Sequence, residues 1–196
     1  MNAFTLYESS SSLSCTAIEI ALLECKVNFK RHELDENKPR TKAFLGRSPF
    51  GKVPVLLEHR LSGELSIWET PAILLFLAER FKDSSLHLND LYFQSEVFAW
   101  VSFWDSEFGE SILRAFKKPS EDEISLLEKR LDVLNGHLSQ KAFLVGAYSI
   151  ADVLATPFLD IIEKIPDISL GRLTSFNSWH ERLRSRPSYQ ALPPPL

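Results

Sequence analysis

The sequence predicts a two-domain protein: an α/β domain with the element order β-α-β-α-β-β-α, followed by an all-helical domain. Two observations predict this division. Up to residue 81, short strand-like segments alternate with segments of helical periodicity. Beyond residue 89, every apolar stripe repeats at helical spacing. We therefore place the first domain at residues 1–82, a polar linker at residues 83–89 and the helical domain at residues 90–196.

The first three elements predict a parallel β-α-β unit. Residues 4–7 have the composition of a short strand, and residues 27–33 alternate as a second strand does. Between them, residues 13–25 have helical periodicity, and the serines at positions 9–12 are suitable N-caps for that helix. A strand, a helix and a strand in this order favour parallel pairing of the two strands.

The remainder of the first domain predicts two paired strands between two helices. Ser62 and Gly63 mark the turn that joins the strands. The expected segments are a short helix within residues 35–47, strands at residues 53–57 and 64–67, and a helix at residues 70–81.

The second domain is expected to contain four helices or more. Its first apolar stripe advances by four, four, three and four residues, which is typical of a long amphipathic helix, and Pro119 and Ser120 then separate it from the next. The tail at residues 186–196 holds four prolines, so we expect it to be extended. The first stripe comprises Phe93, Val97, Val101, Trp104 and Phe108, and the later helices are expected at residues 124–138, 149–163 and 170–184.

Composition and charge exclude several classes of protein. The net charge of -4 and the lack of a basic cluster argue against nucleic acid as a partner. No apolar run approaches the roughly 20 residues that span a bilayer, and the five histidines lack metal-ligand spacing, so we expect neither a membrane nor a metal partner. Cys15 and Cys25 would lie about 15 Å apart on one helix, too far for a disulfide. Free thiols and the absence of a secretory signal favour the cytoplasm.

Three segments carry a more specific signal. Residues 47–56 are RSPFGKVPVL, residues 69–77 are ETPAILLFL, and residues 143–152 are FLVGAYSIAD. In order and spacing they resemble the soluble glutathione transferases, whose first domain carries Pro-x-Gly-Lys-Val-Pro-x-Leu and then Glu-Ser-x-Ala-Ile, and whose helical domain carries Gly-x-x-Ser-x-Ala-Asp. The resemblance covers nearly the whole chain. It implies a thioredoxin-like first domain and a transferase of the serine-type classes.

The resemblance also implies a glutathione site in the first domain. Pro54 would be cis, so that the main chain of Val53 can pair with the extended tripeptide. Thr70, at a helix N-terminus, would hold the γ-glutamyl carboxylate, Glu69 the ammonium group, and Lys52 the glycine carboxylate. Taken singly, Glu69 and Thr70 would more often be only a helix cap, and Lys52 only a solvated surface charge.

A hydroxyl in the loop before the first helix is expected to stabilise the glutathione thiolate. Alignment with the serine-type classes places Ser12 at this position, and Ser10, Ser11, Ser14 and Cys15 are the alternatives. A hydroxyl donor at a helix N-terminus lowers the pKa of a thiol. The competing interpretation is that Ser12 or Ser14 only caps the helix.

Other residues separate this chain from the family pattern or carry weaker expectations. Tyr7 is a less favoured hydroxyl donor, because it lies inside the first strand and is expected in the core. The arginine that often follows the catalytic serine is absent, with Thr16 and Ala17 in that stretch. Trp104 and Phe108 are candidates for a hydrophobic-substrate pocket, although most aromatic stripes at helical spacing are core.

In the helical domain, residues 149–152 form a predicted capping box. We expect its acid, Asp152, to be structural rather than catalytic.

The function implied is attack of the glutathione thiolate on an electrophilic carbon of an apolar substrate, with glutathione as co-substrate and no metal. A homodimer in the cytoplasm is expected, as is usual in the family. Two alternatives stay open: a glutathione-dependent isomerase or thiol–disulfide oxidoreductase, and a glutathione-transferase-like binding module that has lost catalysis. An exposed Cys15 with a lowered pKa would favour disulfide exchange.

Overall fold

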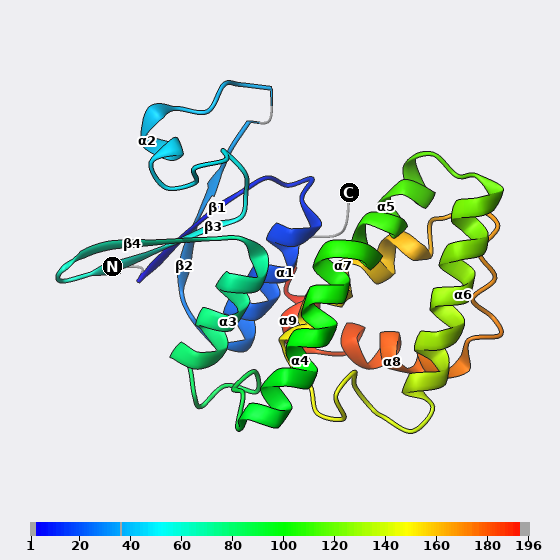
Figure 1. The fold of residues 1–196 in the computed structure, drawn as a ribbon. Helices are drawn as coiled ribbons and strands as arrows, with labels where there is room; N and C mark the ends of the chain where they lie inside the picture. Colours follow the sequence, from blue (N-terminus) through cyan, green and yellow to red (C-terminus); the bar gives the residue numbers. More distant parts are fainter. Residues whose placement is uncertain (1–2, 36, 193–196) are drawn as a thin grey trace. The chain divides into compact units, whose positions relative to one another are not determined.

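The computed structural model of the chain describes residues 3–35 and 37–192, and it is drawn in Figure 1. The chain forms two compact units, Met1–His87 with Leu192–Leu196, and Leu88–Ala191. The first unit has the α/β order that the sequence predicts, and the second is helical throughout its described elements.

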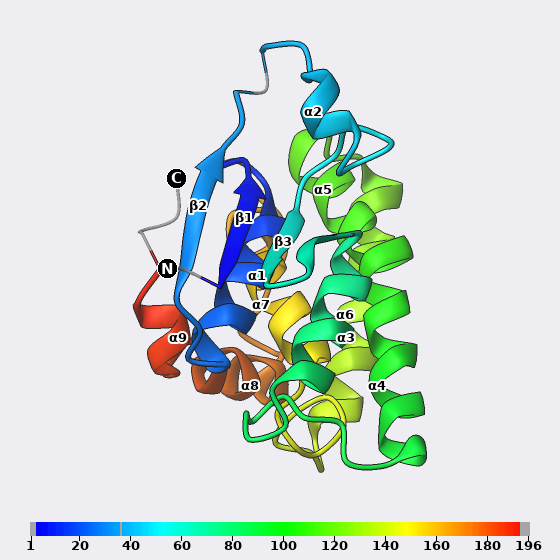
Figure 2. The same cartoon turned by 90° about the vertical axis from the view of Figure 1, so that its left-hand side faces the viewer.

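A four-stranded sheet forms the centre of the first unit. Its strands are β1 (Phe4–Glu8), β2 (Phe29–Glu33), β3 (Val55–Arg60) and β4 (Gly63–Trp68), in the spatial order β2-β1-β3-β4. The pair β1 and β2 is parallel, as the β-α-β pattern predicts, and β3 is antiparallel to both β1 and β4. Figure 2 shows β2, β1 and β3 side by side.

The described part of this unit also contains the helices α1 (Leu13–Glu24), α2 (Lys42–Leu45) and α3 (Thr70–Arg80). One face of the sheet packs against α3, since the ring of Phe4 contacts that of Phe76 at 6.4 Å. The alternate residues of the strands point to the other face, where they form an apolar cluster around a side chain of α2. That cluster consists of Tyr7, Phe44, Val55 and Leu57. The burial of Tyr7 confirms the prediction that it belongs to the core.

The helices of the second unit pack around α7, in which eleven side chains are buried. This helix contacts α4, α5 and α8. In chain order the elements are α4 (Leu91–Phe103), the π-helix η1 (Trp104–Phe108), α5 (Gly109–Lys117), α6 (Glu121–Leu138), α7 (Ile150–Ile162), α8 (Thr174–Arg184) and α9 (Pro187–Gln190).

Two expectations for this unit were wrong in detail. The stripe that predicts one uninterrupted α-helix is divided by the π-turn η1, a wider turn that brings the rings of Trp104 and Phe108 to 4.7 Å. The tail is not wholly extended, because Pro187 begins the short helix α9. Proline suits a first helical position, where its missing N–H would have no helical partner. The last four residues of the predicted tail lie outside the described part.

Candidate functional site

A cis peptide bond joins Val53 to Pro54, as the sequence motif predicts. Pro54 is buried, and β3 begins at the next residue, with Val55 paired to Tyr7 of β1 and to Trp68 of β4. Val53 itself precedes the strand. Its peptide groups therefore stand at the end of the β3 ladder, where an extended ligand can pair with them.

Side chains fix the loop that leads to this bond. Ser48 is buried, and its hydroxyl donates to the carbonyl of Lys52 at 2.8 Å. The Nε of Arg40 donates to the carbonyl of Gly51 at 3.0 Å. Gly51 has a φ of 67°, a left-handed conformation that glycine adopts without steric cost. The side chain of Lys52 is exposed at the end of this loop.

The N-terminus of α3 adjoins the same strands, because α3 follows β4 directly. Glu69 is its N-cap residue, and it makes no side-chain cap hydrogen bond. Glu69 also has a φ of 69°, which is uncommon for a residue with a Cβ. Its side chain is exposed, whereas Thr70 is buried. The side chain of Glu69 therefore accepts no hydrogen bond from the main-chain N–H groups in the first turn of α3. N–H groups at a helix N-terminus can bind an anion.

The serines in and just after the loop between β1 and α1 differ in their exposure and in their hydrogen bonding. Ser12 is half-buried as the N-cap of α1, and its Oγ accepts from the N–H of Cys15 at 3.3 Å. Ser10 and Ser11 are exposed and line a cavity of about 430 Å³ together with residues that follow β2. Ser14 lies in the first turn of α1 and is half-buried. Of the four, only Ser12 has its hydroxyl at the helix N-terminus as a cap.

The structure contradicts Cys15 as an exposed nucleophile. Its side chain is 2% exposed, and burial raises the pKa of the Cys15 thiol to about 11, although a hydrogen bond with Ser12 lowers it in part. The helix that carries it is buried on most of its circumference, so its position near the N-terminus does not bring it to the surface. A thiol that is both buried and protonated is unsuited to disulfide exchange.

Two carboxyl groups beneath the same loop add to this effect. Glu8 ends β1 and Glu19 lies on α1, and both approach Arg31 of β2, with 3.6 Å between Arg31 Nε and the Glu8 carboxylate. Burial and a hydrogen bond with Glu19 raise the pKa of Glu8 to about 8. Their negative charge also raises the pKa of Cys15. Sequence reasoning missed this cluster, because its members come from three separate elements.

Trp104 and Phe108 do not line an open pocket. Both side chains are fully buried in the second unit, and Trp104 lies 6.1 Å from the ring of Phe158 and 6.4 Å from that of Trp179. Their burial argues against contact with a substrate, and it agrees with the alternative that the aromatic stripe is core.

Asp152 is structural, as predicted. It accepts from the N–H of Ser149 at 3.0 Å, which completes the capping box of α7, and from the indole N–H of Trp179 at 2.9 Å. It is wholly buried, so it joins the start of α7 to α8 without reaching solvent.

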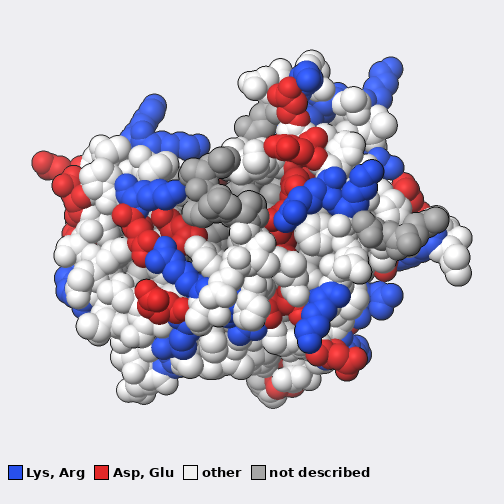
Figure 3. Space-filling view, turned by 180° about the vertical axis from the view of Figure 1, so that it is seen from behind, with Lys and Arg blue, Asp and Glu red and all other residues white. Residues whose placement is uncertain are grey.

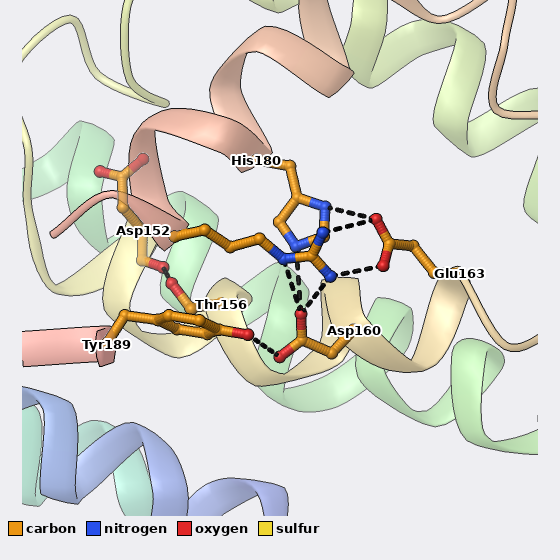
Figure 4. Close-up of polar contacts among 7 residues, drawn as sticks. Asp152, Thr156, Asp160, Glu163, His180 and Tyr189 are labelled. Carbon is orange, nitrogen blue, oxygen red and sulfur yellow. Dashed lines mark hydrogen bonds and ion pairs between the residues drawn. The ribbon is translucent and has the colours of Figure 1, made fainter. Parts of the chain in front are cut away.

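A second polar cluster lies further along α7, and Figure 4 shows it. Asp160 accepts from Tyr189 at 2.9 Å, from Arg184 at 2.9 Å and from His180 at 3.2 Å. Glu163 pairs with the other ring nitrogen of His180 at 3.3 Å. His180 is 3% exposed, so a substrate cannot reach it, and we interpret the cluster as a connection between α7, α8 and α9.

Two kinds of feature are absent from the described residues. Within them no group of three or more His, Cys, Asp or Glu side chains is arranged to hold a metal ion. Among the helices in the same residues, none combines the length and apolar character that crossing a bilayer needs. Figure 3 shows Lys and Arg interspersed with Asp and Glu over the visible face.

The sheet order, the cis-proline and the helical second unit define the class of two-domain proteins with a thioredoxin-like domain followed by a helical domain. The family model described as "Glutathione S-transferase, N-terminal domain" matches residues 2–79, and the one described as "Glutathione S-transferase, C-terminal domain" matches residues 96–187. The chain belongs to the glutathione S-transferase family. This membership supports glutathione transferase as its enzyme class and glutathione as its co-substrate.

Individual relatives agree with this assignment. "Glutathione S-transferase 2" of Schizosaccharomyces pombe is 24% identical over 226 residues, covering 97% of this chain and 95% of that protein. "Probable elongation factor 1-gamma 1" of Arabidopsis thaliana is 34% identical over 133 residues, but they cover 62% of this chain and only 31% of that protein. The solved structure of "Ure2p in Complex with Glutathione" has a TM-score of 0.85 at 24% identity, covering 97% and 98% of the two chains, which shows a shared fold.

Proposed function

We propose that this protein binds glutathione on its first unit and transfers it, as a thiolate, to the electrophilic carbon of an apolar substrate. The observation that carries the proposal is the position of Val53 just before β3, which pairs in the sheet with β4, the strand that leads into α3. This arrangement offers peptide groups at the end of β3 and N–H groups at the start of α3, which suit an extended, anionic tripeptide.

Each end of the tripeptide has a proposed partner. The main chain of Val53 pairs with the cysteinyl residue of glutathione as a short added strand. Thr70 and the first N–H groups of α3 bind the γ-glutamyl carboxylate, and the exposed Glu69 accepts from the ammonium group. The exposed Lys52 binds the glycine carboxylate.

Ser12 is the proposed donor to the sulfur. Its Oγ accepts one hydrogen bond from the main chain, and its hydroxyl proton would donate to the sulfur of glutathione in place of the hydrogen bond with Cys15. A hydrogen bond to the thiolate favours the charged form and lowers the pKa of the thiol. The thiol proton leaves to solvent, the sulfur lone pair forms the C–S bond, and the electrophile takes up the electron pair or releases its leaving group.

The partner state and location are proposals as well. We propose a homodimer in the cytoplasm, since both are usual in the family. An apolar groove of about 450 Å³ on the second unit supports the dimer, because a solvent-exposed groove of this kind is typical of an interface.

Replacement of Ser12 by Ala tests the proposed chemistry. We expect kcat for conjugation of a panel of electrophiles to fall at least about tenfold, with the Kd for glutathione changed by less than about threefold, because the hydroxyl acts on the thiolate. The pH at which the bound thiol ionises should rise. A Ser12→Ala variant that retains full kcat and the same pH profile would contradict the assignment of Ser12 as the hydrogen-bond donor to the sulfur.

Loss of the helix cap needs its own control, since a cap contributes about 1 kcal/mol. Ser120 caps α6 and accepts from the N–H of Glu123 at 3.3 Å, the same distance as at Ser12. Ser120→Ala should therefore lower stability by a similar amount without lowering kcat. Ser10→Ala, Ser11→Ala and Ser14→Ala then test the alternative donors.

A non-catalytic binding module is the second candidate. The elongation-factor relative favours it, because it shares 34% identity with this chain and its name describes no transferase. Isothermal titration distinguishes the two candidates: heat of binding to glutathione without turnover of any electrophile supports the module. The buried Cys15 gives no support to disulfide exchange through that residue.

A further inference from the structure

Arg47 links two strands of the sheet to the loop that leads to Val53. One terminal nitrogen donates to the hydroxyl of Tyr7 on β1 at 2.6 Å, and the other donates to the carboxylate of Glu64 on β4 at 2.8 Å. The guanidinium also lies over the Tyr7 ring, 5.4 Å from its centre. Because β3 lies between these strands, the side chain of Arg47 bridges the sheet across β3.

The partners of Arg47 are themselves held in place. Glu64 also pairs with His59 Nδ1 at 3.2 Å, and the other ring nitrogen of His59 bonds to the buried Thr5 hydroxyl at 2.9 Å. Tyr7 is 8% exposed and packs in the cluster around Phe44. The guanidinium therefore bonds to two acceptors whose positions the sheet fixes, and a planar guanidinium suits such paired recognition.

Within the segment that Arg47 holds, the hydrogen bonds of Ser48 and Arg40 fix the loop locally, whereas Arg47 bonds to side chains of the sheet. The helix α2 has four residues, and Phe44 is its only buried side chain. A helix this short is unstable on its own, so its position depends on tertiary contacts. The main chain continues from Arg47 through Ser48 and Gly51 to Lys52 and the cis bond. Displacement of Arg47 would displace the peptide groups at Val53.

We propose that Arg47 is a positioning residue for glutathione binding, which holds the loop of residues 48–53 against the sheet through Tyr7 and Glu64. The inference rests on the proposed function, because it assigns the loop to the glutathione site. Arg47 would act on glutathione binding through the loop, without contacting glutathione itself. Such supporting residues keep a binding site in its productive geometry.

Kinetics of Arg47→Met test the proposal. We expect the KM for glutathione to rise about tenfold, with kcat and the KM for the electrophile within about twofold, since only the pre-ordering of the loop is lost. Arg47→Lys keeps the charge but not the paired geometry, and it should restore part of the affinity. Arg172→Met is the control, because Arg172 forms a similar exposed pair with Asp132 in the second unit.

A mutant cycle separates this role from an ordinary surface ion pair. Tyr7→Phe removes only the hydroxyl acceptor, and we expect it to raise the KM for glutathione about threefold. In the Arg47→Met background the same change should have no further effect. Full additivity of the two changes, or an unaltered KM in Arg47→Met, overturns the proposal.

Hydrogen exchange gives a readout that does not depend on glutathione. The amide of Ser48 bonds to the carbonyl of Phe44, and that of Gly51 to the carbonyl of Ser48, both at 2.9 Å. Arg47→Met should accelerate exchange of these amides without accelerating exchange in α7. If the wild type binds no glutathione, the proposed function fails, and exchange then tests only the structural part of the proposal: unchanged rates at Ser48 and Gly51 overturn the role of Arg47 in holding the loop, and faster rates support that role alone.

Discussion

Gly109 has no room for a side chain. A Cβ at this position would lie 2.7 Å from the carbonyl oxygen of Trp104 and 2.8 Å from the ring of Phe158. Both neighbours are fixed, the first by the π-turn and the second by the core around α7. We predict that Gly109→Ala lowers the free energy of unfolding by about 1–3 kcal/mol, because the added methyl must displace packed groups. Urea unfolding measures this change.

A second helical glycine supplies the matched control. Gly136 lies in α6, and a Cβ there would meet nothing within 4 Å. Gly136→Ala should therefore raise the free energy of unfolding by about 0.5–1 kcal/mol, through helix propensity alone. Equal effects of the two substitutions would contradict the packing argument at Gly109.

Single residues differ in how far the sequence predicts them. The cis bond before Pro54 could be predicted from the resemblance to the family, and the role of Asp152 because its capping box involves residues only a few positions away. The burial of Cys15 could not, since α1 is buried around most of its circumference and has no clear polar face to orient it. Nor does any residue type indicate the positive φ of Glu69, which depends on how β4 joins α3.

At the scale of elements, helical period and turn residues were sufficient for the order of strands and helices. The first unit has every predicted element, with boundaries shifted by a few residues. The π-turn η1 was missed, because a stripe stepping by three and four residues does not distinguish an α-turn from a wider one. The roles of Trp104 and Phe108 stayed open for a similar reason: spacing identifies the inward face but not whether it borders core or pocket, and their burial favours the core.

The cluster around Asp160 shows how three helices are joined by one carboxylate. Burial alone would raise the pKa of Asp160, but hydrogen bonds from His180, Arg184 and Tyr189 outweigh it and hold that pKa below its ordinary value. We predict that Asp160→Asn lowers the free energy of unfolding at pH 7 by about 3 kcal/mol, since it leaves buried donors without a charged acceptor. Tyr189→Phe should cost about 1 kcal/mol.

The sign of the pH dependence follows from the lowered pKa. The unfolded chain binds the proton of Asp160 more readily, so the stabilisation is present above the ordinary pKa of about 3.8 and is lost as pH falls through the folded-state value. The difference in Tm between wild type and Asp160→Asn should therefore shrink on acidification below about pH 4. Asp132→Asn, at an exposed pair with Arg172, should change stability by less than about 1 kcal/mol. A difference that persists unchanged into acid would contradict the argument.

At the scale of the whole molecule, the second unit exposes an apolar groove between α4 and α6. Its lining includes Trp100, Phe103, Val133 and Leu134, and Val133 is 73% exposed. Lys129 and Arg130 also line the groove. Apolar residues with charged groups beside them are typical of an association surface.

This groove gives the homodimer proposal a direct test. We expect the wild type to elute at twice the chain mass of 22.4 kDa in light-scattering chromatography. Val133→Glu should weaken the dimer at least about 100-fold, because association would remove from water a carboxylate that the monomer leaves solvated. Leu61→Glu adds the same charge at a fully exposed turn of the first unit and should leave the dimer intact.

A wild-type monomer would refute the dimer, whereas a dimer unaffected by Val133→Glu would place its interface elsewhere. A kcat that changes in step with the loss of dimer as the protein is diluted would show that the active site depends on the partner.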